Sequence, residues 1–177
     1  KLTLVGVISG RSVRNLTKRI SLPGVTYIGN HGLERCVDGE VKENFNSEKY
    51  LPMLAFSAKE LKKIKLDGIR VEDKGVTLTL HYRQTADPES ARDLLLPRVK
   101  KIAAQTELEF FEGRMIFELR PPVKADKGHA FEQLVQEFNL DSALYVGDDT
   151  TDIAALEVAQ KLRREKQAYA IGVGVMS

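Results

Sequence analysis

Cysteine is almost absent from this sequence of 177 residues, which contains only Cys36. A single cysteine excludes an internal disulfide framework of the kind that stabilises many small secreted domains. One unpaired thiol fits a reducing compartment, and the cytoplasm is the expected location. The hydrophobic fraction of 42% and the chain length suffice for a packed core, so we expect a globular protein.

The sequence also lacks a strong charge of one sign and long apolar runs. The net charge is only +2, and the basic residues are spread along the chain, so nucleic acid is not an expected partner. No apolar stretch approaches the roughly 20 residues that span a bilayer. No basic segment followed by an apolar segment has the pattern of a leader peptide. We therefore expect no membrane association.

What the sequence does contain is an acidic cluster directly after an apolar run. Residues 143–146 read Ala-Leu-Tyr-Val, and residues 147–152 read Gly-Asp-Asp-Thr-Thr-Asp. Such a strand, followed by a helix, puts carboxylates at the carboxyl end of a sheet, where open α/β sheets bind ligands. Three acids within five positions repel one another unless a cation such as Mg²⁺ lies among them. The cluster indicates phosphate chemistry; the alternative is an aspartate-rich capping turn.

Two segments of the chain have the pattern of a parallel α/β core. The expected strands are at 2–8, 25–28, 143–146 and 168–175, and the expected helices are at 13–20, from Lys127 and from about Thr151. Continuous apolar strands are typical of a parallel sheet that is buried on both faces. The predicted fold class is therefore α/β, with a Rossmann-like parallel-sheet core.

The middle of the chain has a different pattern, in which each helix precedes a pair of alternating strands. One expected helix is capped by Ser47, and the other begins at Asp87-Pro88. The expected strands are at 69–72, 76–83, 108–112 and 115–120. We interpret this as an α-β-β-α-β-β cap domain at 36–120, inserted between core segments at 1–35 and 121–177.

Alternation gives the inserted sheet one apolar face and one polar face. The polar face carries Thr77, Thr79, His81, Arg83, Arg114, Glu118 and Arg120. Two interpretations remain open. This face is either the solvated side of a half-buried sheet or a sugar-binding surface, because sugars are gripped by planar groups that form paired hydrogen bonds.

Ser9 and Lys127 stand where a phosphate site needs them. Ser9-Gly10-Arg11 follows the first strand, where a hydroxyl and exposed backbone N–H groups can hold phosphate oxygens. Lys127 precedes a helix and can neutralise a phosphate. Asp148 can contact a metal directly, and Asp152 can hold metal-bound water or orient Lys127. Each has an ordinary alternative, with Ser9 as a helix cap and Lys127 as an exposed surface charge.

The order of these segments resembles the haloacid dehalogenase superfamily of phosphatases, whose second, third and fourth motifs match Ser9, Lys127 and residues 147–152. More specifically, the chain resembles the trehalose-6-phosphate phosphatase family over nearly its whole length. The matching segments are residues 7–11, 29–34, 71–75, 81–83, 118–121 and 127–128. This resemblance implies a Mg²⁺-dependent phosphoric monoester hydrolase that converts trehalose 6-phosphate to trehalose and phosphate.

The resemblance also implies roles for individual residues. Ser9 and Lys127 are expected to be catalytic, and Asp148 and Asp152 to bind the metal. The expected substrate-binding residues are Gly10, Arg11, His31, Gly32, Glu34, Lys74, His81, Arg83, Arg114 and Glu118. His31 and Glu34, at the crossing from core to cap, are either contacts or scaffolding. The implied partners are a small sugar phosphate and, by fusion or association, a trehalose-phosphate synthase.

The family's nucleophile has no counterpart in this sequence. It is an aspartate of an Asp-x-Asp motif on the first core strand, and no such motif precedes Ser9. In the family that strand lies between those carrying the second and fourth motifs, so its absence would leave two rows of backbone groups unpaired. We expect the native protein to extend upstream, which makes the core incomplete here.

Two other functions remain open. The same chemistry can serve another sugar phosphate, such as sucrose phosphate or a hexose phosphate. A non-catalytic binding or regulatory domain is favoured by the missing nucleophile and opposed by the retained Lys127, Asp148 and Asp152. A dinucleotide-binding fold is excluded, because residues 6–10 lack the tight glycine pattern that it needs.

Overall fold

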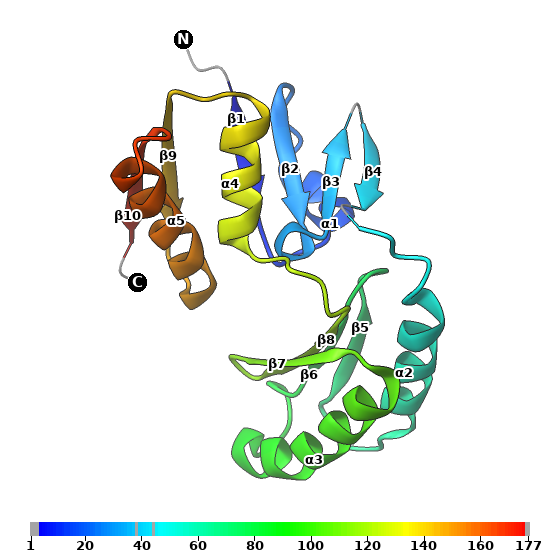
Figure 1. The fold of residues 1–177 in the computed structure, drawn as a ribbon. Coiled ribbons are helices and arrows are strands. Elements are labelled where there is room, and N and C mark those ends of the chain that lie inside the picture. The colour runs from blue at the N-terminus through cyan, green and yellow to red at the C-terminus, as the bar shows by residue number, and fades with distance from the viewer. Residues whose placement is uncertain (1–3, 38, 44, 176–177) are drawn as a thin grey trace. The chain divides into compact units, whose positions relative to one another are not determined.

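The structure, a computed structural model, describes residues 4–37, 39–43 and 45–175. Contacts divide the chain into two compact units, residues 1–44 with 124–177 and residues 45–123 (Figure 1). The first unit contains the parallel strand pairs and the second contains an antiparallel sheet. The predicted α/β class with an inserted module is confirmed. In the described residues, no helix has both the length and the apolar character needed to cross a bilayer.

One sheet of the first unit has the order β1-β2-β3-β4. Strands β1 (Val5–Ile8) and β2 (Val25–Gly29) are parallel and are joined through helix α1 (Val13–Arg19). Strands β3 (Glu34–Val37) and β4 (Glu40–Glu43) continue the sheet as an antiparallel hairpin. The predicted domain boundary at residue 36 puts most of this hairpin in the cap, whereas its pairing with β2 groups it with the first unit.

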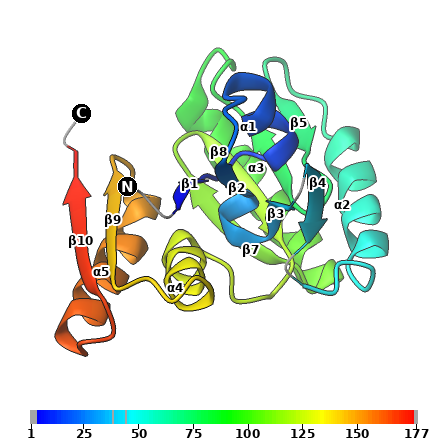
Figure 2. The same ribbon diagram turned by 90° about the horizontal axis from the view of Figure 1, so that it is seen from above.

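The second sheet of this unit is a parallel pair. The elements in this part are α4 (Lys127–Glu137), β9 (Ser142–Gly147), the 3-10 turn η2 (Thr150–Asp152), α5 (Ile153–Arg164) and β10 (Tyr169–Gly174). Helix α5 covers one face of this pair (Figure 2). It packs through Ala155, Ala159 and Leu162, which have no exposed surface. The opposite face is largely open, because Leu144 and Val146 are more than half exposed.

The second unit forms the expected α-β-β-α-β-β module. Its elements are α2 (Leu51–Lys63), β5 (Arg70–Asp73), β6 (Leu78–His81), α3 (Pro88–Thr106), β7 (Glu109–Gly113) and β8 (Ile116–Arg120). The sheet order is β5-β6-β8-β7, and all neighbours are antiparallel. Its apolar face, with Leu80 and Phe117, packs against Leu61 of α2 and Leu95 of α3. Asp87 caps α3 as predicted, accepting hydrogen bonds from two backbone N–H groups.

Candidate active site

Lys127 is fixed at the first residue of α4 and is buried. The Asp126 carboxylate accepts a hydrogen bond from the His129 N–H at 2.7 Å, which caps the helix. The Lys127 side chain is 10% exposed, and its Nζ donates to Asp152 Oδ1 at 2.8 Å. The interpretation of Lys127 as an exposed surface charge is therefore wrong. A buried ammonium held in one place is the kind of group that can stabilise a transferring phosphoryl group.

Asp152 is a carboxylate surrounded by donors. In addition to Lys127, the Tyr145 hydroxyl donates to Oδ1 at 2.5 Å and the Asp149 N–H donates to Oδ2 at 3.0 Å. Burial opposes ionisation of Asp152, but the hydrogen bonds from Lys127, Tyr145 and Asp149 outweigh it and lower its pKa. Burial, together with the hydrogen bond to this carboxylate, raises the pKa of Tyr145. This geometry favours an orienting role for Asp152 toward Lys127.

Gly147 allows Asp152 to approach the end of β9. A Cβ atom at residue 147 would lie 2.4 Å from Asp152 Cγ, so any side chain there would displace the carboxylate. The acidic segment thus has two structural roles. Asp149 caps η2 and Asp152 completes the capping box, while Asp152 also binds Lys127.

Asp148 follows β9 at its carboxyl end and is exposed. Among the residues that the structure describes, no three Asp, Glu, His or Cys side chains are grouped closely enough to hold a metal ion. Mg²⁺ in phosphate sites is bound through one or two carboxylates, substrate oxygens and water. Asp148 therefore fits as one ligand, and the described residues do not form a complete magnesium site.

The Ser9-Gly10-Arg11 loop is held by neighbouring backbone. The Ser9 N–H donates to the Ile28 carbonyl at 3.0 Å, and Ser9 Oγ accepts from the Arg11 N–H at 3.2 Å. The N-cap of α1 is Ser12, whose Oγ accepts from the Asn15 N–H. The interpretation of Ser9 as the helix cap is therefore wrong.

A short 3-10 turn contacts both this loop and the start of α4. In the turn η1 (Asn30–Gly32), the His31 N–H donates to the Ser9 carbonyl at 2.9 Å. On its other side, Gly32 lies against Ala130 and the Asp126 carbonyl, which a Cβ on Gly32 would meet at 3.3 Å. The Ser9 loop and the Lys127 helix start therefore both adjoin η1.

Glu34 is buried and forms hydrogen bonds within the first unit, which is the core unit below. Its Oε1 accepts from the Val13 N–H at 3.1 Å and from Asn30 Nδ2 at 2.5 Å. Sequence reasoning included Glu34 but missed Asn30 and Tyr145. Asn30 could have been found, because it lies within the family-matching segment 29–34. Nothing in the apolar run 143–146 indicated that the Tyr145 hydroxyl would form a hydrogen bond in the site.

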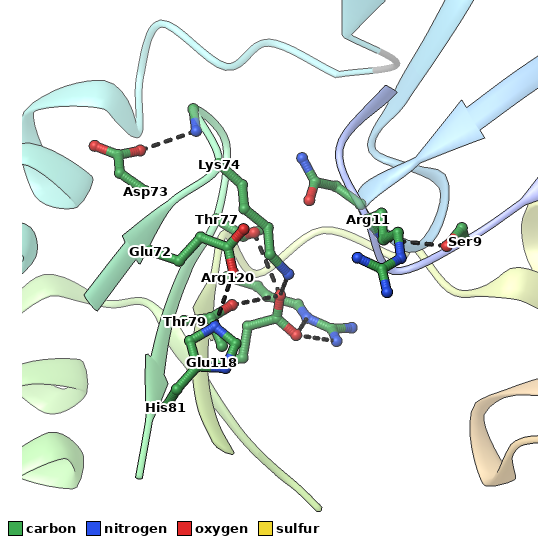
Figure 3. A network of polar contacts seen from close by, with 12 residues as sticks. Ser9, Arg11, Glu72, Asp73, Lys74, Thr77, Thr79, His81, Glu118 and Arg120 are labelled. Atoms are coloured by element: carbon green, nitrogen blue, oxygen red, sulfur yellow. Dashed lines mark hydrogen bonds and ion pairs between the residues drawn. The ribbon is translucent and has the colours of Figure 1, made fainter. Parts of the chain in front are cut away.

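In the second unit, Glu118 is the centre of a polar network on the sheet (Figure 3). Its Oε1 accepts from Lys74 Nζ at 3.1 Å and from the hydroxyls of Thr77 and Thr79, at 3.3 and 3.4 Å. Its Oε2 accepts from Arg120 Nε and Nη2 at 3.0 and 2.5 Å. The predicted polar face exists, but Thr77, Thr79 and Glu118 are buried and not solvated.

The other predicted cap residues are His81, Arg83 and Arg114. His81 Nε2 is 2.7 Å from Glu72 Oε2, and this hydrogen bond helps to lower the pKa of Glu72 against the opposing effect of burial. Arg83 and Arg114 are exposed, and Arg83 Nη2 donates to the Arg114 carbonyl at 3.4 Å. Arg114 lies in the turn between β7 and β8 and not on a strand.

Asp152→Asn is expected to lower the free energy of unfolding at pH 7 by about 3 kcal/mol, because it leaves buried Lys127 without its counter-ion. The folded-state pKa of Asp152 is depressed, so its contribution is present above the unfolded-state pKa and is lost as pH falls through the folded one. Between pH 7 and pH 3, the free energy of unfolding measured with urea should therefore fall less in the variant than in the wild type.

The control for this experiment is Asp93→Asn, which removes an exposed aspartate paired with Arg92. It should leave both the stability and its acid dependence nearly unchanged. An Asp152→Asn protein with the wild-type acid dependence would contradict the lowered pKa.

Comparison with known proteins gives one consistent result. A family model described as trehalose-phosphatase matches residues 2–176. The chain is 32% identical over 171 residues to a trehalose-phosphate phosphatase of Mycobacterium avium, covering 88% of this chain and 41% of that protein. It thus spans less than half the length of this curated relative.

Solved structures share the fold. The chain resembles the crystal structure of a trehalose-6-phosphate phosphatase related protein with a TM-score of 0.81 and 24% identity, covering 97% of this chain and 69% of that one. It also resembles the C-terminal domain of the Candida albicans trehalose synthase regulatory protein, with a TM-score of 0.72, 15% identity, and coverage of 98% and 71%. The family model and the curated relative assign the family: the chain belongs to the trehalose-phosphatase family.

Proposed function

We propose that the protein containing this chain is a Mg²⁺-dependent phosphatase that hydrolyses trehalose 6-phosphate. The observation that carries the proposal is the buried Lys127–Asp152 pair beside the acidic segment 147–152. A purely structural ion pair is rarely favoured over apolar packing, because desolvation costs as much as the attraction returns. A buried ammonium bonded to Asp152, in the same acidic segment as exposed Asp148, is more readily explained by phosphate chemistry.

The proposed nucleophile is an aspartate upstream of this chain. Within the described residues, β1 and β9 are edge strands of two separate sheets, and each pairs with one parallel neighbour. Ile8 of β1 packs against the clusters of both α4 and α5, so the two edges belong to one packed unit. A strand inserted between β1 and β9 would pair both rows of backbone groups and cover part of the exposed Leu144 and Val146.

In the proposed reaction, the upstream carboxylate attacks phosphorus as the bond from phosphorus to the sugar oxygen breaks, and the second carboxylic acid of the upstream motif protonates the leaving oxygen. Water then attacks the aspartyl-phosphate, which releases phosphate and restores the carboxylate. Ser9 Oγ and Lys127 Nζ bind oxygens of the transferring group, and Asp152 holds Lys127 in place. Asp148 would contribute to holding Mg²⁺, which would supply positive charge to the phosphoryl oxygens when bound. Residues of the Glu118 network contribute to sugar binding.

A non-catalytic role is the second candidate, because a trehalose synthase regulatory protein shares this fold. At 15% identity that likeness concerns the fold alone and does not separate a regulatory domain from an enzyme. Association with a trehalose-phosphate synthase is proposed on the same ground and is compatible with either role.

The test is phosphate release by the polypeptide extended upstream, measured with a panel of sugar phosphates. Trehalose 6-phosphate should give the highest kcat/KM, exceeding sucrose 6-phosphate and glucose 6-phosphate by about 10² or more, because a site built to bond a particular set of hydroxyls rejects others strongly. Chelation of divalent cations should stop the reaction. Absence of phosphate release from every sugar phosphate would favour the regulatory role.

A further inference from the structure

Two successive residues of η1 have left-handed backbone conformations although neither is glycine. The φ angle is 46° at Asn30 and 59° at His31, and Gly32 follows with 110°. Side chains make this conformation costly, and residues hold it only where the surrounding structure fixes them. The contacts that fix this turn therefore indicate what it is for.

The backbone contacts of this turn are made to the Ser9–Arg11 loop. The Asn30 N–H donates to the Arg11 carbonyl at 2.8 Å, and the His31 N–H donates to the Ser9 carbonyl at 2.9 Å. Both carbonyl groups that flank Gly10 are thereby bonded to the two left-handed residues. The His31 ring lies directly against Gly10, since a Cβ atom there would be 2.4 Å from His31 Nε2.

Side chains tie the turn to the other end of the same loop. Asn30 is completely buried, and its Nδ2 donates to Glu34 Oε1 at 2.5 Å. The same oxygen accepts from the N–H of Val13, the first residue of α1, at 3.1 Å. One carboxylate oxygen therefore joins the strained turn to the residue at which the loop enters its helix.

These contacts decide between two roles for Glu34. Oε1 of this carboxylate already accepts two hydrogen bonds within the same unit, and the residue is 6% exposed. The Val13 N–H is likewise bonded to Glu34 and is not directed at a phosphate oxygen. Glu34 thus belongs to the support of the loop.

We propose that Asn30 and Glu34 are positioning residues that hold the Ser9–Arg11 loop in the geometry that binds a phosphoryl group. The proposal rests on the phosphatase function proposed above. Neither residue touches the substrate in this assignment; each acts through the position of Ser9 and of the loop backbone.

The test compares Glu34→Ala, Glu34→Gln and Asn30→Gly in the polypeptide extended upstream. Glu34→Ala should lower kcat by about 10- to 100-fold and change KM less than threefold, because a small misplacement of groups around a reacting centre costs rate. Glu34→Gln should restore most of kcat, since its carbonyl oxygen still accepts hydrogen bonds. Asn30→Gly permits the left-handed backbone but removes the amide, and should lower kcat like Glu34→Ala.

Amide hydrogen exchange provides a readout that does not need activity. In Glu34→Ala, the amides of Val13, Asn30 and His31 should exchange about tenfold faster or more, while that of Leu80 in the second unit should not change. Glu40→Ala, on the exposed strand β4, is the matched control and should change neither exchange nor kcat.

Two results would overturn the proposal. A rise in KM for the sugar phosphate at unchanged kcat would make Glu34 a substrate contact. A uniform acceleration of exchange throughout the core unit, with normal kcat in the folded fraction, would make it a stability residue only. If the wild type releases no phosphate, the phosphatase proposal fails. The exchange experiment still decides whether Asn30 and Glu34 hold the loop, because local acceleration supports that role and uniform acceleration contradicts it.

Discussion

Asp148→Asn in the polypeptide extended upstream is expected to abolish Mg²⁺-dependent phosphate release, with a loss of at least about 10³-fold in kcat/KM. Charge stabilisation by a bound metal ion is worth several kcal/mol in a phosphoryl-transfer transition state, and each 1.4 kcal/mol or so is tenfold in rate. The carboxamide keeps the size of the side chain but loses the charge that attracts Mg²⁺. Release of inorganic phosphate over a range of Mg²⁺ concentrations measures the effect.

The fold should survive this substitution, because Asp148 is exposed and follows the last residue of β9. Urea unfolding should show a stability within about 0.5 kcal/mol of the wild type, as for other surface substitutions. The matched control is Asp141→Asn, an exposed aspartate at the opposite end of the same strand, which should retain full turnover. Undiminished turnover in Asp148→Asn would remove the metal assignment.

The sequence predicts most of the fold because the spacing of apolar residues distinguishes helices from strands. The runs at 25–28 and 143–146 and the helical spacing at 13–20 all correspond to observed elements. The hairpin of β3 and β4 was not predicted. Its strands are only four residues long, and β4 is exposed at every position, so there is no apolar alternation from which to recognise it. Its pairing with β2 is a tertiary contact, which the local sequence pattern does not predict.

Predictability of the candidate site depends on the kind of information needed. Orienting Lys127 was one of the two roles that the sequence left open for Asp152, since motif order shows which residues belong together. The two-fold alternation correctly put Glu118 and Arg120 on one face of the sheet, but it says nothing of what covers that face, and so burial of Glu118 was missed. The left-handed turn at Asn30 arises from tertiary contacts, which composition does not reveal.

The burial of Glu118 gives the second large expected effect. Glu118→Ala should lower kcat/KM for trehalose 6-phosphate by about 10²-fold while lowering that for a small aryl phosphate less than threefold. Hydrogen bonds to charged groups contribute about 1.5–3 kcal/mol each, and this carboxylate orients both Lys74 and Arg120. Without it those two cations would repel each other and take up new positions, so a sugar bound through them would lose its contacts.

An aryl phosphate has no sugar to bind and should depend only on the first unit. The comparison of the two substrates therefore separates loss of sugar recognition from loss of chemistry. An equal decrease in kcat/KM for both substrates would mean that this network does not recognise the sugar.

The matched control must separate recognition from stability, because removing one partner of a buried network is destabilising. Glu112→Ala serves this purpose: Glu112 lies on β7 of the same sheet and pairs with Arg92 on the surface. It should leave both substrates unaffected. Glu118→Gln keeps two of the hydrogen-bond acceptor positions and removes the charge, so it should fall between the wild type and Glu118→Ala for the sugar phosphate alone. That ordering, and not the size of any single loss, distinguishes a carboxylate that orients sugar-binding cations from one that only stabilises the sheet.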